Sequence, residues 1–389
     1  MGRLHGYSWG NIAWQASVAY SRATLQALGS SAWAYRQSWR RPPEKRWTRT
    51  PWSWIYRIFL DDGVAAGSWR ALAAWVSRLE RGFADIGLDL KRDKRMGIPM
   101  ADTDVAAEDR ANFADCDWVA CGNFKSLGAA FGTDEFCNAQ LRKRIEKARK
   151  LMTRIGEMDD PQTALLLLRY CAGYAKVQYS ARTVPRHLQE EGLASYSVAL
   201  RSAMETVLRR GLDERGWRQA QLGIADGGLG LRLPEVHAAA AYTASVRGAR
   251  HKLEDMLASS LKELEQAETG ALQELRKDLP EEAELQGPPG KGAQKSLSNV
   301  IDLGIRKRLK QGPGADLAYR QHLELQSKRG SGAWLTAEPG EGKHMEPELF
   351  RLAVARRLRQ PICEKDTLCP FCGEIMDRFG DHALVCSCK

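Results

Sequence analysis

The sequence of 389 residues lacks several features that would assign it to a membrane or to secretion. It has no apolar run of about 18 residues, and a membrane-spanning helix needs about 20. Its first residues contain no apolar signal-peptide core, and Gly6 stands where a myristoylation motif requires Ser or Thr. We therefore expect no membrane span, no secretory leader and no lipid anchor.

Aspartate is missing from residues 1–60, where Glu44 is the one acidic residue. Seven of the 12 tryptophans lie in residues 1–54, together with a cluster of bases. Interleaved Trp and Arg can stack on bases and contact phosphates. No apolar period continues through this stretch, so we leave residues 1–54 as an unassigned Trp/Arg-rich segment. The bases are Arg36, Arg40, Arg41, Lys45, Arg46 and Arg49.

The overall composition is that of a folded protein with an anionic partner. The chain is 43% hydrophobic and 27% charged, with a net charge of +10 and a pI near 9.2. Such a basic balance favours nucleic acid ahead of a membrane surface. The nine cysteines are an odd number with a cluster at one end, which predicts a reducing setting, nuclear or cytoplasmic.

Two adjacent acids, Asp61 and Asp62, lie between apolar runs at residues 54–60 and 64–66. This pattern predicts a β-hairpin with the acids at its tip. Phosphoryl-transfer enzymes use such carboxylates to hold divalent metal ions. A solvated Asp-Gly turn is the simpler alternative.

The residues after the hairpin point to a family. Apolar residues from Ser68 to Ile86 recur at helical spacing, Gly87 ends that helix, and residues 88–94 are predicted to form a short strand that ends at Lys94. This series, from Phe59-Leu60-Asp61-Asp62 to Lys94, resembles the palm of reverse transcriptases from LINE-like (non-LTR) retrotransposons. The resemblance implies Mg²⁺ bound by Asp61 and Asp62, with Lys94 near the incoming nucleotide. It also implies that the Phe124–Gly128 turn, which contains Lys125, grips the primer.

The resemblance is incomplete upstream of the hairpin. The family's palm needs a further aspartate from a separate strand and a Gly-rich box, and neither stands before Asp61. We therefore expect a portion of an RNA-directed DNA polymerase, a nucleotidyltransferase, that is inactive alone. A separate chain or an upstream segment would supply the rest of the palm, and Mg²⁺ would bind only there. The alternative is a non-catalytic, zinc-containing nucleic-acid-binding protein derived from a retroelement.

Residues 136–250 are predicted to be helical. Three stretches within them resemble the thumb of the same polymerases: Leu167–Tyr170, Arg182–Pro185 and Gly227–Arg232. Apolar residues from Leu141 to Ile155 share one helix face, and bases surround it. Such a basic face could follow a nucleic-acid backbone, although a merely solvated face is an equal alternative. Asp160, Pro161, Pro185 and Pro234 are predicted to begin further helices. The glycines of Gly227-Gly228-Leu229-Gly230 are best explained by close backbone packing. The bases expected to contact nucleic acid are Arg142, Lys143, Lys147 and Lys150.

Residues 251–330 are predicted to be a helical segment interrupted by the Gly/Pro linker 287–292. The basic segment 306–310 is either a further phosphate contact or a solvated helix. Earlier in the chain, Cys116 and Cys121 have no second pair nearby, so we expect thiols without a metal.

The clearest local motif is at the C-terminal end. Cys369 and Cys372 form a C-x2-C turn, and His382 and Cys386 follow as H-x3-C. These are the ligand types and spacings of a tetrahedral zinc site, provided that His382 and Cys386 share one helix face. Cys363 and Cys388 remain possible substitutes. In the retroelement family such a module is thought to handle nucleic acid.

The expected fold is α+β and mostly helical, with RNA and DNA as partners and Zn²⁺ as cofactor. The expected segments are 1–54 unassigned, 55–135 partial palm, 136–250 thumb-like, 251–330 helices and linker, and 331–389 zinc-binding module.

Overall fold

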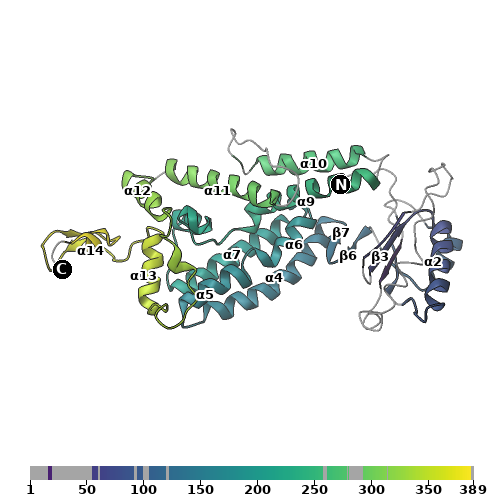
Figure 1. Ribbon diagram of the computed structural model, residues 1–389, viewed down its shortest axis with the longest axis horizontal. Helices are drawn as coiled ribbons and strands as arrows, with labels where there is room; N and C mark the ends of the chain where they lie inside the picture. Colours follow the sequence, from purple (N-terminus) through teal and green to yellow (C-terminus); the bar gives the residue numbers. More distant parts are fainter. Residues whose placement is uncertain are drawn as a thin grey trace. The chain divides into compact units, whose positions relative to one another are not determined.

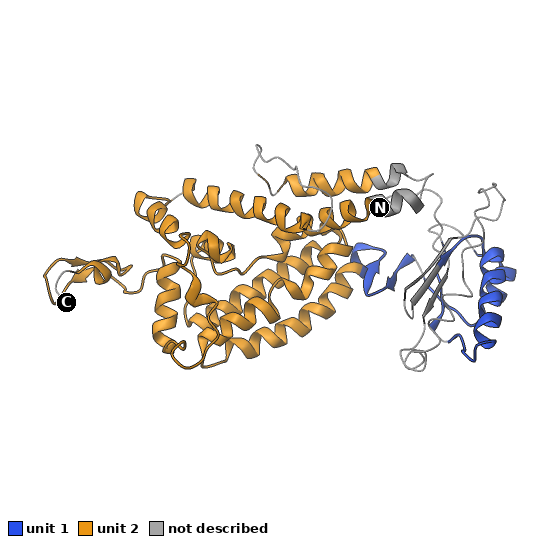
Figure 2. Ribbon diagram, viewed as in Figure 1, with its two compact units in different colours: residues 1–136 blue, residues 137–389 orange. Residues whose placement is uncertain are grey.

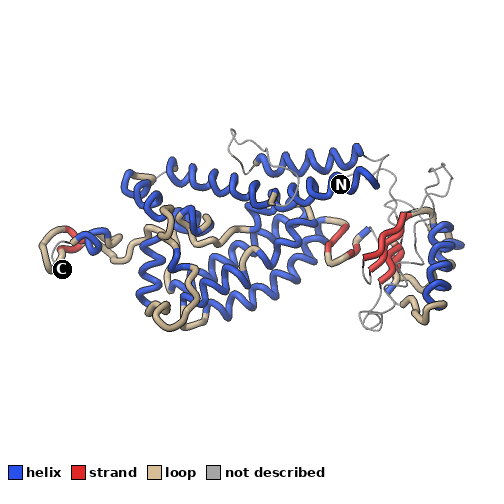
Figure 3. Tube along the Cα trace, viewed as in Figure 1, coloured by secondary structure: helices blue, strands red, loops and turns tan. Residues whose placement is uncertain are grey.

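The computed structural model describes residues 16–19, 55–59, 62–91, 94–99, 105–119, 122–256, 261–277, 279, 292–312 and 314–386. The chain forms two compact units, residues 1–136 and residues 137–389 (Figure 2). Most described residues are helical and the strands are short, so the expected α+β, mostly helical class is confirmed (Figure 3).

The first unit contains a five-stranded sheet with the order β2-β3-β1-β4-β5. Strands β2 and β3 form the predicted antiparallel hairpin, in which Phe59 pairs with Asp62. Strand β1 pairs with the other edge of β3 and places Ala19 opposite Asp62. Strands β4 and β5 complete the sheet as a parallel pair. The strands are β1 (Ala16–Ala19), β2 (Ile55–Phe59), β3 (Asp62–Ala66), β4 (Met96–Gly97) and β5 (Asp117–Trp118).

Helix α2 (Trp69–Ala84) confirms the predicted helix after the hairpin. The Ser68 hydroxyl caps its first turn by accepting from the Ala71 N–H, and Gly87 adopts a left-handed φ of 74° just beyond its end. Its apolar face is buried in a small core with Ala65, Leu90 and Phe113. The unit also contains α3 (Ala107–Ala111) and the hairpin β6 (Phe124–Ser126) and β7 (Ala129–Phe131).

The predicted strand over residues 88–94 is wrong. Residues 88–91 and Lys94 are not extended in a sheet, and the strand lies later, at Met96–Gly97. Asp and Lys are poor strand formers. Gly97, in contrast, fits against the Trp118 ring, where an added Cβ would lie 2.9 Å from a ring carbon.

The second unit is built from helices that pack on one another (Figure 1). The predicted starts at Asp160, Pro185 and Pro234 are confirmed: Asp160 caps α5, Pro185 precedes η6, and Pro234 begins α9. Helix α9 packs against α6, α10 and α11. The elements up to α9 are α4 (Asp134–Gly156), α5 (Pro161–Leu167), η5 (Leu168–Ala172), α6 (Ala175–Thr183), η6 (Arg186–Gln189), α7 (Glu190–Leu208), α8 (Glu214–Gln221), η7 (Ile224–Asp226) and α9 (Pro234–Met256). Those that follow are α10 (Leu261–Arg276), α11 (Ala293–Gln311), α12 (Leu317–Gln326), η8 (Ala333–Leu335), α13 (Pro347–Arg357), β8 (Thr367–Leu368), β9 (Ile375–Met376) and α14 (Asp381–Val385).

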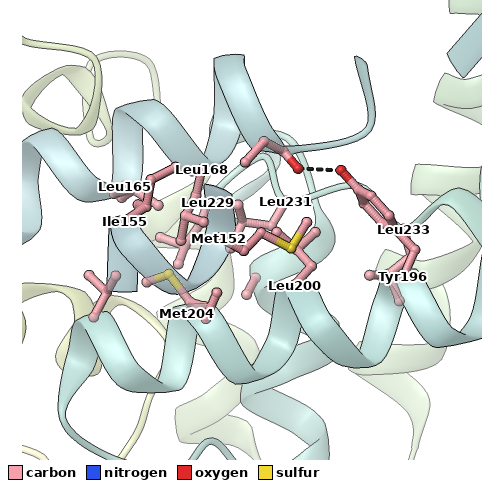
Figure 4. Packing of buried hydrophobic residues seen from close by; sticks show 14 of the residues in the cluster. Met152, Ile155, Leu165, Leu168, Tyr196, Leu200, Met204, Leu229, Leu231 and Leu233 are labelled. Carbon is pink, nitrogen blue, oxygen red and sulfur yellow. Dashed lines mark hydrogen bonds between the residues drawn. The ribbon is translucent and has the colours of Figure 1, made fainter. Parts of the chain in front are cut away.

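The main core joins residues far apart in the sequence (Figure 4). Met152 of α4, Leu200 of α7 and Leu231 of the loop before α9 belong to it. The Tyr196 hydroxyl lies inside this core and donates to the backbone oxygens of Ala172 and Gly173, which satisfies it without water. The apolar face predicted for residues 141–155 is therefore confirmed as a core face.

The conformation of the loop between α8 and α9 explains why the loop is rich in glycine. An added Cβ on Gly228 would lie 2.2 Å from the Leu222 oxygen, and Gly227 and Gly230 have φ values of 90° and 76°. The expected close packing is confirmed at Gly228, and the left-handed backbone at Gly227 and Gly230 is a second reason for glycine that was not predicted. The loop is held by Arg357 of α13, whose guanidinium donates to the oxygens of Gly228 and Ile224 at 3.1 and 2.8 Å.

Helix α13 belongs to the main core. Phe350, Val354 and Leu358 are buried there, and the metal-ligand candidates begin only after α13 ends. The segment 331–389 thus consists of a part that packs into the helices and a small terminal part that carries the Cys and His residues. We call residues 361–386 the terminal module.

We predict that Leu200→Ala lowers the free energy of unfolding by about 2–5 kcal/mol, because Leu200 is fully buried in the main core. Val198→Ala on the same helix is the control, since Val198 is 68% exposed and such changes stay within about 0.5 kcal/mol. Guanidinium unfolding followed by circular dichroism measures both. Equal losses for the two variants would contradict the assigned face of α7.

Candidate metal centre

The β8–β9 turn places two thiols next to each other. Cys369 and Cys372 lie in the connection between the strands, whose register pairs Leu368 with Ile375. The Cys369 N–H donates to the Glu374 oxygen at 2.8 Å, and the Gly373 N–H donates to the Cys369 oxygen at 2.9 Å. Gly373 has a φ of 75°, which a residue with a side chain rarely adopts. The C-x2-C spacing therefore closes as a tight turn.

Helix α14 supplies the other two ligand candidates. The Cys386 N–H donates to the His382 oxygen at 2.8 Å, so the two residues are one helical turn apart on the same face, as predicted. Asp377 caps this short helix: its carboxylate accepts the N–H groups of His382 and Phe379, both at 2.9 Å. Burial opposes ionisation of Asp377, but these backbone bonds prevail and lower its pKa. Asp377 was not among the site residues predicted from the sequence.

The four candidate ligand atoms converge. The thiol sulfurs and a His382 ring nitrogen all lie within 4.8 Å of one another. The Cys386 sulfur is 3.8 Å from those of Cys369 and Cys372, and the Cys372 sulfur is 3.2 Å from His382 Nε2. A tetrahedral site with metal–sulfur bonds of about 2.3 Å has sulfur–sulfur edges of about 3.8 Å. The cluster therefore fits a four-coordinate metal ion.

The surroundings of the cluster favour the thiolate form of one cysteine, Cys369. The backbone N–H groups of Cys372 and Phe371 lower the pKa of Cys369 to about 6, since they stabilise the negative sulfur. At Cys372 the Glu374 N–H acts in the same direction, but burial and the neighbouring sulfurs of Cys369 and Cys386 raise its pKa. A cation bound between these sulfurs would stabilise their thiolate forms, because it offsets the repulsion between neighbouring negative charges.

The other cysteines stay outside the cluster as far as the structure describes them. Cys363 is exposed and does not belong to the group, whereas Cys388 lies outside the described residues. Cys116 is a free thiol whose pKa is raised mainly by burial, and Cys121 lies outside the described residues. Cys363 is therefore not the substitute ligand that the sequence had left open.

Asp381 connects the terminal module to α13. Its carboxylate pairs with Arg356 at 3.3 Å and with Arg359 at 2.5 Å. Arg359 is buried and has a left-handed φ of 53°, and its guanidinium carbon lies 4.4 Å from the centre of the Phe379 ring. A non-glycine residue in this conformation is held by its surroundings. The first turn of α14 is thus fixed both to its own module and to the helical core.

The predicted catalytic residues are described only in part. Asp61 lies outside the described residues, and the backbone of Asp62 begins β3. Strand β1, which pairs with β3, has the sequence Ala-Ser-Val-Ala and carries no acid. Lys94 is exposed just before β4, and Lys125 is exposed in β6.

The basic residues predicted on α4 lie on its surface. Arg142, Lys143, Lys147 and Lys150 are all exposed. Arg142 pairs with Glu191 at 2.6 Å and Lys150 lies 4.0 Å from Glu146, whereas Lys143 and Lys147 have no ion-pair partner among the described residues. Exposed pairs such as these contribute little to stability. Lys143 and Lys147 are therefore the cations of this face that no described carboxylate neutralises.

No protein-family model, no curated protein and no solved structure matches this chain. Among the described residues, no helix combines the length and the apolar character that crossing a membrane demands.

We predict one tetrahedral metal ion per chain, lost in Cys372→Ser. Removing one of four ligands should weaken binding at least tenfold, since even outer-shell changes cost 10–100-fold at such sites. Elemental analysis by mass spectrometry and chelator competition on the full chain provide the measurement. Cys363→Ser is the matched control and should keep full occupancy. Equal metal affinity of both variants in the chelator competition would show that Cys372 is not a ligand.

Proposed function

We propose that this chain is a zinc-containing nucleic-acid-binding protein, a portion of a reverse transcriptase of the LINE-like type that does not polymerise by itself. The observation that carries the proposal is the exposed basic face of α4 on a well-packed helical unit. The metal is proposed to be zinc because three thiolates and one imidazole form a ligand set that Zn²⁺ prefers. Four protein ligands leave no open position, so the ion has a structural role.

The α4 face is suited to a phosphate backbone. Lys143 and Lys147 are one turn apart on the helix, so their ammonium groups can contact successive phosphates. Arg144 lies beside them, with its guanidinium 5.4 Å from the centre of the Tyr179 ring. Tyr179 is 44% exposed and offers a ring on which a base can stack. Cations and an aromatic ring together support binding of a single strand with little sequence preference.

The basic segment of α11 is a weaker candidate. Arg306 and Lys310 both pair with Glu324 of α12, Arg306 at 2.8 Å. A carboxylate between two bases reduces the local potential that a phosphate would experience. We therefore expect the principal contact with nucleic acid on α4 and no essential contact from residues 306–310.

The assignment to a reverse transcriptase is supported by the order of elements in the first unit. A hairpin that brackets Asp61 and Asp62 is followed by the amphipathic helix α2, which is the arrangement that the resemblance implies. Ala19 stands opposite Asp62, and no carboxylate is available from β1. Two divalent ions about 4 Å apart need carboxylates from more than one strand. Asp61 and Asp62 alone are therefore insufficient for catalysis.

We predict that the full chain binds mixed-sequence single-stranded RNA and that Lys143→Ala/Lys147→Ala weakens this binding. The logarithm of the affinity falls as the logarithm of the salt concentration rises, and each phosphate contact on a single strand contributes about 0.7 to the steepness of that fall. Loss of two contacts should therefore make the fall shallower by roughly 1.4. Fluorescence anisotropy across a salt series measures the slope.

The control variant is Lys328→Ala/Arg329→Ala, which removes the same charge from two other exposed positions. Its slope should match that of the unmodified chain. If the two double variants behave alike, binding follows net charge and the α4 face has no special part.

We predict no primer extension on an RNA template with Mg²⁺ or Mn²⁺. Losing a metal-binding carboxylate costs several kcal/mol in the transition state, and each 1.36 kcal/mol is tenfold in rate. Extension that disappears in Asp61→Ala would contradict the prediction, because another acid of this chain would then complete the site.

A further inference from the structure

The terminal module exposes an unusual amount of apolar surface. Among the described residues, 16 large hydrophobic side chains are exposed, and five of them fall within residues 368–385. Their exposed fractions run from 59% to 77%. Single exposed apolar residues need no explanation, but a concentration of them marks an interaction site. The five are Leu368, Phe371, Ile375, Leu384 and Val385, and we call them the apolar surface.

The apolar surface is held in place by the Cys/His cluster. Leu368 and Ile375 pair across β8 and β9, so their side chains lie on the same face of this hairpin. Phe371 lies in the turn between Cys369 and Cys372, and α14, which carries Leu384 and Val385, packs against β9. The cluster takes the place of an apolar core inside the module, which leaves these side chains outside.

The charge around the apolar surface is negative, unlike that of the whole chain. Residues 361–386 contain five acids and two bases, whereas the chain as a whole carries +10. Asp366, Asp377 and Asp381 have hydrogen-bond or ion-pair partners within the protein, while the side chains of Glu364 and Glu374 are exposed. Three thiolates around a divalent ion would add a further negative charge. Phosphates are repelled by such a surface, and cationic side chains are attracted to it.

We propose that the apolar surface of the terminal module docks a basic amphipathic segment of a partner protein, with apolar side chains against Phe371 and Ile375 and Lys or Arg beside Glu364 and Glu374. The inference goes beyond the proposed nucleic-acid binding and does not depend on it. The second unit would then bind opposite partners at two separate surfaces: an anionic polymer on α4 and a cationic peptide on the terminal module.

The test uses the full chain and a fluorescein-labelled amphipathic helical peptide of leucine and lysine as probe. Anisotropy should report binding that weakens at least tenfold in Phe371→Ser/Ile375→Ser and in Glu364→Lys/Glu374→Lys. None of these residues is a proposed metal ligand, and unchanged metal content would show that the module is still folded. The control is Leu303→Ser/Leu317→Ser, which removes two apolar side chains with 59% and 65% exposure from α11 and α12. It should bind the peptide like the unmodified chain.

Three results would overturn the proposal. Equal peptide binding by the control and the module variants would show that the probe attaches elsewhere. Weaker RNA binding in Phe371→Ser/Ile375→Ser, with peptide binding unchanged, would make the surface a base-stacking site. Concentration-dependent dimerisation that these substitutions abolish would identify a second copy of the chain as the occupant.

Discussion

The buried guanidinium of Arg357 is the interaction on which the second unit depends. It has no carboxylate partner among the described residues and donates instead to the oxygens of Gly228, Ile224, Ser331 and Gln326. Burial lowers its pKa to about 10, so it remains a cation at neutral pH. A buried charge is tolerated only when it is fully hydrogen-bonded. The α8–α9 loop, α12 and α13 must therefore assemble together, and the neighbouring Arg356 and Arg359 extend this assembly to the terminal module through Asp381.

The features that could be predicted from the sequence are those that depend on residues close to one another along the chain. Apolar spacing was sufficient for α2 and for the buried face of α4, because helix periodicity is local. The four metal ligand candidates were found for the same reason, since a turn and a helical turn bring each pair together. The strand placed at Lys94 was wrong because β4 forms where Met96 and Gly97 meet β1 and β5, distant partners that no local pattern contains. The roles of Arg357 and Arg359 were not predicted. Arg357 bonds mainly to backbone oxygens and Arg359 pairs with Asp381, and both sets of partners are distant in the sequence.

Two surfaces of the second unit differ in the side chains that they expose. On α4, Lys143 and Lys147 project from a helix whose opposite face is locked in the main core, so the charges are held on a rigid support. On the terminal module, a Cys/His cluster holds apolar and acidic side chains at the surface. The net charge of the whole chain does not reveal this difference, because the excess of basic residues lies outside the terminal module.

The central claim is that nucleic acid contacts the helical unit at α4 and not the terminal module. Ultraviolet crosslinking of the full chain to mixed-sequence single-stranded RNA, followed by mass-spectrometric mapping of the crosslinked peptides, tests it most directly. The account predicts crosslinks in peptides from α4 and α6, with Tyr179 as the favoured aromatic acceptor, and none at Phe371. Crosslinks concentrated on residues 361–386, with α4 and α6 unmodified, would contradict it.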